Sequence, residues 1–388
     1  MVLRGFGTTI FAEMSALATA TGAINLGQGF PDTDGPPAML DRAVHGLRNG
    51  ENQYPPGPGV PALRDAIAAH RELHYRLSYD PASEVLVTVG ATEAVAAAML
   101  GLCDPGDEVV LFEPYYDSYA AAIELAGARR VPVALRPDSS GRFGFDPDEL
   151  RAAITPRTRL LLINSPHNPT GTVLTGDELA VIAALCRDHD LLVVTDEVYE
   201  HLTYDGTAHV PIATLPGMRE RCLAISSAGK TFSVTGWKIG WVCGPEPLLR
   251  QVNTVKQFLT FTHNPAMQHA VAYALGNELG WVADLRSSLA RARDLLADGL
   301  ERVGMAVTRP EGTYFIQADI RPLGTSDGNA FARQLPHAAG VVGVPTAVFC
   351  DSTAGDPFVR FAFCKRPEVI DEAVQRLARF AATVAPSS

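Results

Sequence analysis

The chain has 388 residues, of which 47% are hydrophobic and 19% are charged, and this is enough apolar material for a globular protein of two domains. Its formal net charge of −11 argues against a nucleic-acid-binding protein, because such a protein needs a basic face. No run of about 18 apolar residues and no signal-peptide core near the N-terminus stands out, so we expect no membrane contact.

From about residue 85, strand-like apolar runs alternate with helical patterns. Strands are expected at 85–89, 108–112, 131–135, 160–163, 191–195 and 223–226, and helices at 61–76, 92–102, 116–126 and 176–188. Strands that alternate with helices favour right-handed crossovers and a largely parallel sheet, with ligands at its carboxyl edge. Residues 237–244 follow the last of these strands too closely for a helical crossover, so we expect an antiparallel strand there.

The pattern changes after about residue 258. One long helical stretch is expected over 265–300, followed by strand-like runs at 307–319, 341–349 and 358–364 and a closing helix from 368. We therefore predict an α/β chain with a large domain at 45–265, a small α+β domain at 266–388, and an N-terminal segment, 1–44, that joins the small domain. A ligand groove is expected between the domains.

Lys230 is the first candidate for chemistry. It lies in Ser226-Ser227-Ala228-Gly229-Lys230-Thr231, directly after a predicted buried strand. A lysine that attacks a carbonyl group must be neutral, and a confined pocket lowers the pKa of its amine. The small neighbours also leave room for a flat ring against the backbone.

Two further strand ends carry polar side chains. Asn164-Ser165-Pro166-His167-Asn168-Pro169-Thr170-Gly171 is expected to form an extended loop. Asp196 and Tyr199 follow the strand at 191–195, and a carboxylate at a buried strand end needs a cation or several hydrogen bonds. The protonated nitrogen of a pyridine ring would be such a cation.

These segments, in this order, resemble the class I aminotransferases that depend on pyridoxal phosphate, or PLP, and have fold type I. Further matching segments are Asn25-Leu26-Gly27-Gln28-Gly29-Phe30-Pro31-Asp32, Asn52-Gln53-Tyr54, Gly90-Ala91-Thr92-Glu93, Glu113-Pro114-Tyr115-Tyr116-Asp117-Ser118-Tyr119 and Phe358-Val359-Arg360-Phe361. The resemblance is strongest to the branch of N-succinyldiaminopimelate, kynurenine and methionine aminotransferases. It implies a large domain with a mostly parallel seven-stranded sheet.

The resemblance also implies roles for individual residues. Lys230, Asp196 and Tyr199 are the implied catalytic residues. The implied cofactor-binding residues are Tyr54, Gly90, Ala91, Thr92, Tyr116, Asn168, Asp196, Tyr199, Ser227, Lys230 and Lys238. Gly29, Asn168 and Arg360 are implied to bind the substrate. Tyr54 is implied to reach the cofactor of the other subunit in a homodimer, and the sequence leaves open whether Tyr115 or Tyr116 stacks on the ring.

Several alternatives remain at this point. The expected reaction moves an amino group between an amino acid and a 2-oxo acid. The first choice of substrates is N-succinyl-LL-diaminopimelate with 2-oxoglutarate. The second choice of amino acid is kynurenine, methionine or an aromatic amino acid. A β-lyase acting on cysteine conjugates, or a cyclising or eliminating enzyme, could use the same scaffold. A transcription regulator with such a domain is not expected, because the resemblance begins by Phe11.

Two smaller expectations concern cysteines and metals. The six cysteines form no Cys-x-x-Cys pair, which favours free thiols in a reducing cytoplasm. His70 and His74 are four residues apart on a predicted helix, which is metal-ligand spacing. No third ligand accompanies them in the sequence, so we expect a solvated helix face and no metal site.

Overall fold

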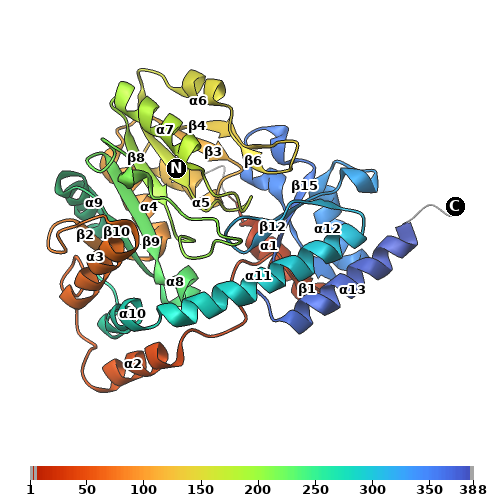
Figure 1. Ribbon diagram of the computed structural model, residues 1–388, viewed down its shortest axis with the longest axis horizontal. Coiled ribbons are helices and arrows are strands. Elements are labelled where there is room, and N and C mark those ends of the chain that lie inside the picture. Colours follow the sequence, from red (N-terminus) through yellow and green to blue (C-terminus); the bar gives the residue numbers. More distant parts are fainter. Residues whose placement is uncertain (1–2, 4–6, 385–388) are drawn as a thin grey trace.

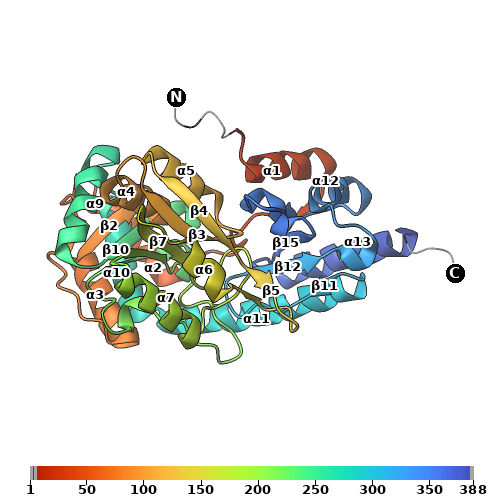
Figure 2. The same ribbon diagram turned by 90° about the horizontal axis from the view of Figure 1, so that it is seen from above.

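The computed structural model describes residue 3 and residues 7–384, with side chains as far as residue 382. The chain folds into a large and a small lobe (Figures 1 and 2). The large lobe is built on a seven-stranded sheet and the small lobe on a four-stranded sheet. Helix α11 (Leu279–Arg302) runs from the first lobe along the second. Within the described residues, none of the helices combines the length and the apolar character that crossing a lipid bilayer requires.

The seven-stranded sheet has the strand order β2-β10-β9-β8-β7-β3-β4. Its strands are β2 (Val85–Val89), β3 (Glu108–Glu113), β4 (Arg129–Ala134), β7 (Thr158–Asn164), β8 (Leu192–Asp196), β9 (Cys222–Ser227) and β10 (Ile239–Cys243). All neighbours are parallel except β10, which is antiparallel to both β2 and β9. The predicted parallel sheet and the predicted antiparallel strand are therefore confirmed.

Helices cover both faces of this sheet. One face packs against α3 (Pro61–Tyr75), α6 (Pro147–Ala153), α7 (Gly176–Asp188) and α10 (Pro265–Asn277), and the other against α4 (Gly90–Leu102), α5 (Asp117–Leu125) and α9 (Glu246–Leu259). Successive strand residues alternate between these two cores: Leu161 and Ile163 face the first, whereas Leu160 and Leu162 face the second. Because both faces are buried, the strands read as continuous apolar runs in the sequence.

The small lobe has an antiparallel sheet of order β11-β12-β15-β14. Its elements are β11 (Ala306–Val307), β12 (Phe315–Asp319), α12 (Gly328–Ala338), β13 (Val341–Val342), β14 (Val344–Pro345), β15 (Phe358–Ala362) and α13 (Pro367–Val384). The N-terminal segment lies here too, because β1 (Ile24–Asn25) pairs in parallel with β13 and α1 (Ile10–Thr21) lies against α12.

Helix α2 (Pro37–Arg48), the short helix α8 (Ala228–Thr231) and the small hairpin of β5 (Arg136–Pro137) and β6 (Phe143–Gly144) complete the described fold.

The structure corrects three of the expected elements. The stretch 265–300 is two helices, because the backbone leaves the helical conformation at Glu278 (φ −111°, ψ 17°). Helix α10 packs on α2 and α3, whereas α11 packs on α13, so one apolar pattern serves two cores. The run 307–319 is broken by Thr313, whose φ is 65°, and 341–349 holds two short strands and a 3-10 turn. The predicted domain boundaries stay a prediction.

Candidate active site

A cavity of about 280 Å³ lies at the carboxyl edge of the large sheet, facing the small lobe. The ends of β2, β7, β8 and β9 contribute Gly90, Asn164, Asp196 and Ser227 to its wall. Parallel strands end at the same edge of a sheet, so residues that follow different strands meet there. The small lobe closes the cavity with Arg360 of β15, next to Gly29 from the N-terminal segment.

The cavity brings together every predicted site residue except Tyr54. Its lining includes Gly29, Gly90, Ala91, Thr92, Tyr116, Asn168, Asp196, Tyr199, Ser227, Lys230, Lys238 and Arg360. Tyr54 is 85% exposed and lies edge-on against Phe261 on the outer surface. Of the two adjacent tyrosines, Tyr116 lines the cavity, whereas Tyr115 packs into the core beside the large sheet.

Lys230 lies on α8, immediately after β9. Its Nζ donates to the hydroxyl of Tyr314 at 2.9 Å and to the carbonyl oxygen of Gly29 at 3.4 Å. Burial of the ammonium end lowers the pKa of Lys230 to about 8. About one molecule in ten then carries a neutral amine at pH 7, against fewer than about one in a thousand for an ordinary lysine.

Asp196 ends β8 and is buried. Burial raises the pKa of its carboxyl group, and the hydrogen bonds to the carboxylate oppose that rise. The Tyr119 hydroxyl donates to Oδ2 at 2.6 Å, and the backbone N–H of Val198 donates to Oδ1 at 3.2 Å. This environment favours a cationic partner in the cavity, because a cation would offset the cost of burying the carboxylate.

The N-terminus of α4 forms a small cup with Lys238. Gly90 has φ +73°, and a Cβ atom placed on it would come within 3.2 Å of Lys238 Nζ. Lys238 Nζ lies 3.5 Å from the hydroxyl oxygen of Thr92, and Ser227 lines the same cavity. Helix N–H groups, two hydroxyls and an ammonium suit an anion such as phosphate.

Arg360 is buried on β15 in a cage of aromatic rings. Its guanidinium lies 3.9 Å from the centre of the Phe315 ring, and it donates to Asn168 Oδ1 at 2.9 Å and to the Gly27 carbonyl oxygen at 2.8 Å. Burial lowers its pKa to about 10, so the group stays charged at pH 7. Arg360 Nε is buried without a hydrogen-bond partner among the described residues, which leaves a donor for a ligand.

The sequence did not point to several residues of the site. Tyr119 and Tyr314 bond Asp196 and Lys230, and Phe11 and Gln28 line the cavity. Tyr119 could have been found, because it lies three residues after Tyr116 and therefore on the same side of a helix start. Tyr314 carries no such signal, because it is 84 residues from Lys230 and meets it through the docking of the two lobes.

Taken together, the fold and the cavity define an α/β enzyme whose weakly basic lysine faces an anion cup and a buried arginine. A model of the family described as aminotransferase class I and II matches residues 21–377. The chain belongs to this family and is an aminotransferase, so the class of enzyme and the fold type expected from the sequence are confirmed.

Individual relatives are similar over nearly the whole chain. A probable N-succinyldiaminopimelate aminotransferase of Mycobacterium tuberculosis is 55% identical and covers 97% of this chain and 96% of its own. A methionine aminotransferase of Escherichia coli is 40% identical, with coverages of 97% and 96%. A solved structure of the N-succinyldiaminopimelate aminotransferase from M. tuberculosis superposes with a TM-score of 0.96 over 98% of this chain and 99% of that one.

Proposed function

We propose that this aminotransferase uses PLP to move an amino group between N-succinyl-LL-diaminopimelate and 2-oxoglutarate, a step of lysine biosynthesis. The assignment of PLP as the cofactor is supported by the convergence of Lys230, Asp196 and the anion cup on one cavity. The substrate rests on the 55% identity to the M. tuberculosis relative. It also rests on residues 28–34 and 52–59, which resemble that group of enzymes.

The residues present fit PLP at each of its polar ends. The phosphate would be held by the anion cup of Gly90, Ala91, Thr92, Ser227 and Lys238. Because Gly90 has no side chain, the Lys238 ammonium can lie close to the backbone at position 90, and both could then contact the phosphate. Asp196 would pair with the ring nitrogen, and Asn168 and Tyr199 would bond the phenolic oxygen. Tyr116 would lie against the ring.

When bound, PLP supplies an electron sink that weakens the bond between the substrate α-carbon and its hydrogen. Lys230 would accept that proton at Nζ and deliver it to the exocyclic carbon of the cofactor, on the other side of the amino nitrogen, since its neutral amine is well populated near pH 8. Tyr314 and the Gly29 carbonyl would hold the Lys230 amine in place during the transfer. Asp196 would keep the ring nitrogen protonated.

Arg360 would bind the α-carboxylate of the substrate. Its guanidinium is already oriented by Asn168 and Gly27 and by stacking on Phe315. A guanidinium fork matches a carboxylate in geometry and charge, and such bonds contribute about 1.5–3 kcal/mol each. Every amino acid and 2-oxo acid has this carboxylate, so Arg360 orients both substrates and does not select between side chains.

Spectroscopy tests the cofactor. The purified protein should show a visible absorption band that borohydride abolishes and that Lys230→Ala lacks. Arg250→Ala, which removes an exposed cation of α9 that pairs with Glu246 and does not line the cavity, is the control and should keep the band. A Lys230→Ala protein that still bound PLP through a reducible bond would contradict the assignment.

Steady-state kinetics test the substrate. N-succinyl-LL-diaminopimelate, kynurenine, methionine, phenylalanine and glutamine should be compared with 2-oxoglutarate as acceptor, and the first should have the highest kcat/KM. A high kcat/KM for an uncharged side chain with no turnover of the succinylated compound would instead support the broad-specificity enzyme. Release of pyruvate and ammonia from a cysteine conjugate would support the β-lyase.

The proposed assembly is a homodimer in the cytoplasm. Tyr54 would help the cofactor of the other subunit, because it lies on the outer surface of its own chain at 85% exposure. Phe258, Phe261 and Leu259 are also exposed there, and exposed apolar patches of this kind mark contact surfaces. Sedimentation should give a dimer. Tyr54→Phe should weaken PLP binding but leave the dimer intact. An active monomer would refute the proposal.

A further inference from the structure

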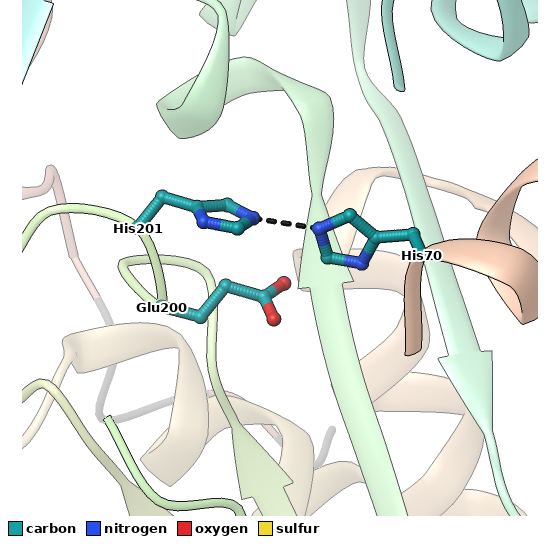
Figure 3. Close-up of side chains that lie close together, drawn as sticks. All are labelled: His70, Glu200 and His201. Carbon is teal, nitrogen blue, oxygen red and sulfur yellow. Dashed lines mark hydrogen bonds between the residues drawn. The ribbon is translucent and has the colours of Figure 1, made fainter. Parts of the chain in front are cut away.

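A second cluster of polar side chains lies behind the cavity, on the far side of the turn that follows β8. Asp196 and Tyr199 of this segment line the cavity, whereas Glu197 and Glu200 bond Arg71 of α3. Figure 3 shows Glu200 and His201 from this turn beside His70, which comes from α3. The cluster is therefore separate from the substrate site but shares a segment of chain with it.

The two imidazole rings and the carboxylate converge. His70 Nε2 lies 2.7 Å from His201 Nε2 (Figure 3), and one ligand atom from each of His70, Glu200 and His201 lies within 4.8 Å of the others. His70 and Glu200 are buried. Two nitrogens bound to one zinc ion at about 2.0–2.1 Å in tetrahedral geometry are about 3.3 Å apart, so the rings need to separate by only about 0.6 Å.

Glu200 retains room for a metal. One of its oxygens accepts from Ser226 Oγ at 2.5 Å, and the other lies 3.2 Å from Arg71 Nη1. A carboxylate has about four lone-pair sites. Ser226, Arg71 and the Tyr75 phenol account for three of them, so one site remains for a metal. His70 Nδ1 is buried with no hydrogen-bond partner among the described residues, and the imidazole pair has satisfied only its Nε2 atoms.

The charges of the cluster favour a cation. The buried carboxylates of Glu197 and Glu200 lie 2.8 and 3.2 Å from the same nitrogen of Arg71, so two carboxylates face one guanidinium. The imidazole of His209 lies 3.5 Å from Glu197. A buried carboxylate without a full counter-charge is costly, and a bound cation would remove that cost.

A route for an ion is present. A cavity on the outer side of the cluster is lined by His74, Glu200, His201, Asp205, His209 and Arg286. The His74 ring is one helical turn after His70, with ring centres 4.5 Å apart. The sequence offered His70 and His74 without a third ligand, and the fold supplies His201 from 131 residues away.

We propose that His70, Glu200 and His201 bind a divalent transition-metal ion of the zinc class, with water in the remaining position. Neutral imidazoles and a carboxylate are ligands that Zn²⁺ and Co²⁺ share. The ion would balance the excess carboxylate charge and tie the turn at 197–201 to α3. Asp196 directly precedes that turn and Tyr199 lies within it, and both line the cavity, so the ion would stabilise the segment that carries them.

Metal titration of the PLP-loaded protein tests this proposal. Untagged protein is treated with a chelator, desalted and titrated with Co²⁺ and then Zn²⁺. We expect one equivalent of Co²⁺ per chain with a ligand-field spectrum of nitrogen and oxygen donors, displacement by Zn²⁺, and a melting temperature that rises with metal concentration.

Variants localise the ion. His201→Gln and Glu200→Gln should each weaken Co²⁺ binding by at least about tenfold. Removing a residue that only hydrogen-bonds a metal ligand already weakens binding by about tenfold or more, and removing a ligand itself should cost at least as much. His189→Gln removes an exposed imidazole elsewhere and should bind like the parent. Circular dichroism checks that each variant folds. If His201→Gln does not fold, X-ray absorption of the zinc-loaded parent gives the ligand set directly, with two imidazoles expected.

Four results would overturn the proposal. They are the absence of binding, affinity that is the same in His201→Gln and the parent, a sulfur-to-cobalt charge-transfer band from one of the cysteines, and loss of binding in His189→Gln.

Discussion

Removal of the Tyr314 hydroxyl should lower the pKa of Lys230. This hydroxyl donates its proton to the Gly29 carbonyl oxygen at 2.5 Å, so its oxygen faces Lys230 Nζ, 2.9 Å away, as an acceptor. An acceptor stabilises the charged ammonium and keeps the pKa from falling further than burial has already lowered it. Tyr314→Phe removes the acceptor and leaves the ring that packs against Tyr199.

The size of the shift follows from the strength of one hydrogen bond to a charged group. Such a bond contributes about 1.5–3 kcal/mol, and each pKa unit corresponds to about 1.36 kcal/mol. The pKa of Lys230, about 8 in the parent, should therefore fall by about one to two units. The neutral amine then predominates near pH 7.

The rate of PLP association with cofactor-free protein reports this pKa, because only the neutral amine reacts. Its pH profile should move to lower pH by one to two units in Tyr314→Phe. Tyr204→Phe is the matched control, since it removes another buried phenol, which donates to the Thr313 carbonyl oxygen at 2.5 Å and does not contact Lys230. An unchanged profile in Tyr314→Phe, or a shift to higher pH, would refute the assigned direction of the bond.

Three further predictions concern the same cavity. Because burial lowers the pKa of Lys230 from 10.5 to about 8, the unfolded chain binds more protons between these values, and the stability of the cofactor-free parent rises with pH across this window. Lys230→Met should accordingly be more stable than the parent at pH 7, by at most about 3.4 kcal/mol, and the gap in urea unfolding should close near pH 10.5. Arg360→Lys keeps the charge but loses the guanidinium fork that binds Asn168 and Gly27. It should lower kcat/KM for amino acids by about 100-fold. An equal loss for amines without a carboxylate would argue against carboxylate binding by Arg360. Asp196→Asn should keep the fold by circular dichroism and lower the transfer rate at least about 100-fold, and a fully active variant would place the partner of the ring nitrogen elsewhere.

The sequence by itself determined the large sheet and most of the cavity wall. Its strands are buried on both faces, so they appear as apolar runs separated by helices, and their order along the chain implies parallel pairing. Asp196, Ser227 and Gly90 come at strand ends, and one edge of a parallel sheet collects such residues without any knowledge of long-range contacts. Local pattern was therefore enough for these positions.

The tertiary structure decided what depends on the docking of distant segments. The break at Glu278 is hidden in the sequence because α10 and α11 each bury an apolar face, although against different cores. Tyr314 meets Lys230, and His201 meets His70, across 84 and 131 residues. Contacts of this kind leave no periodic signal, because they depend on how the two lobes and the turn after β8 pack together, and only the folded chain brings those side chains within hydrogen-bonding distance.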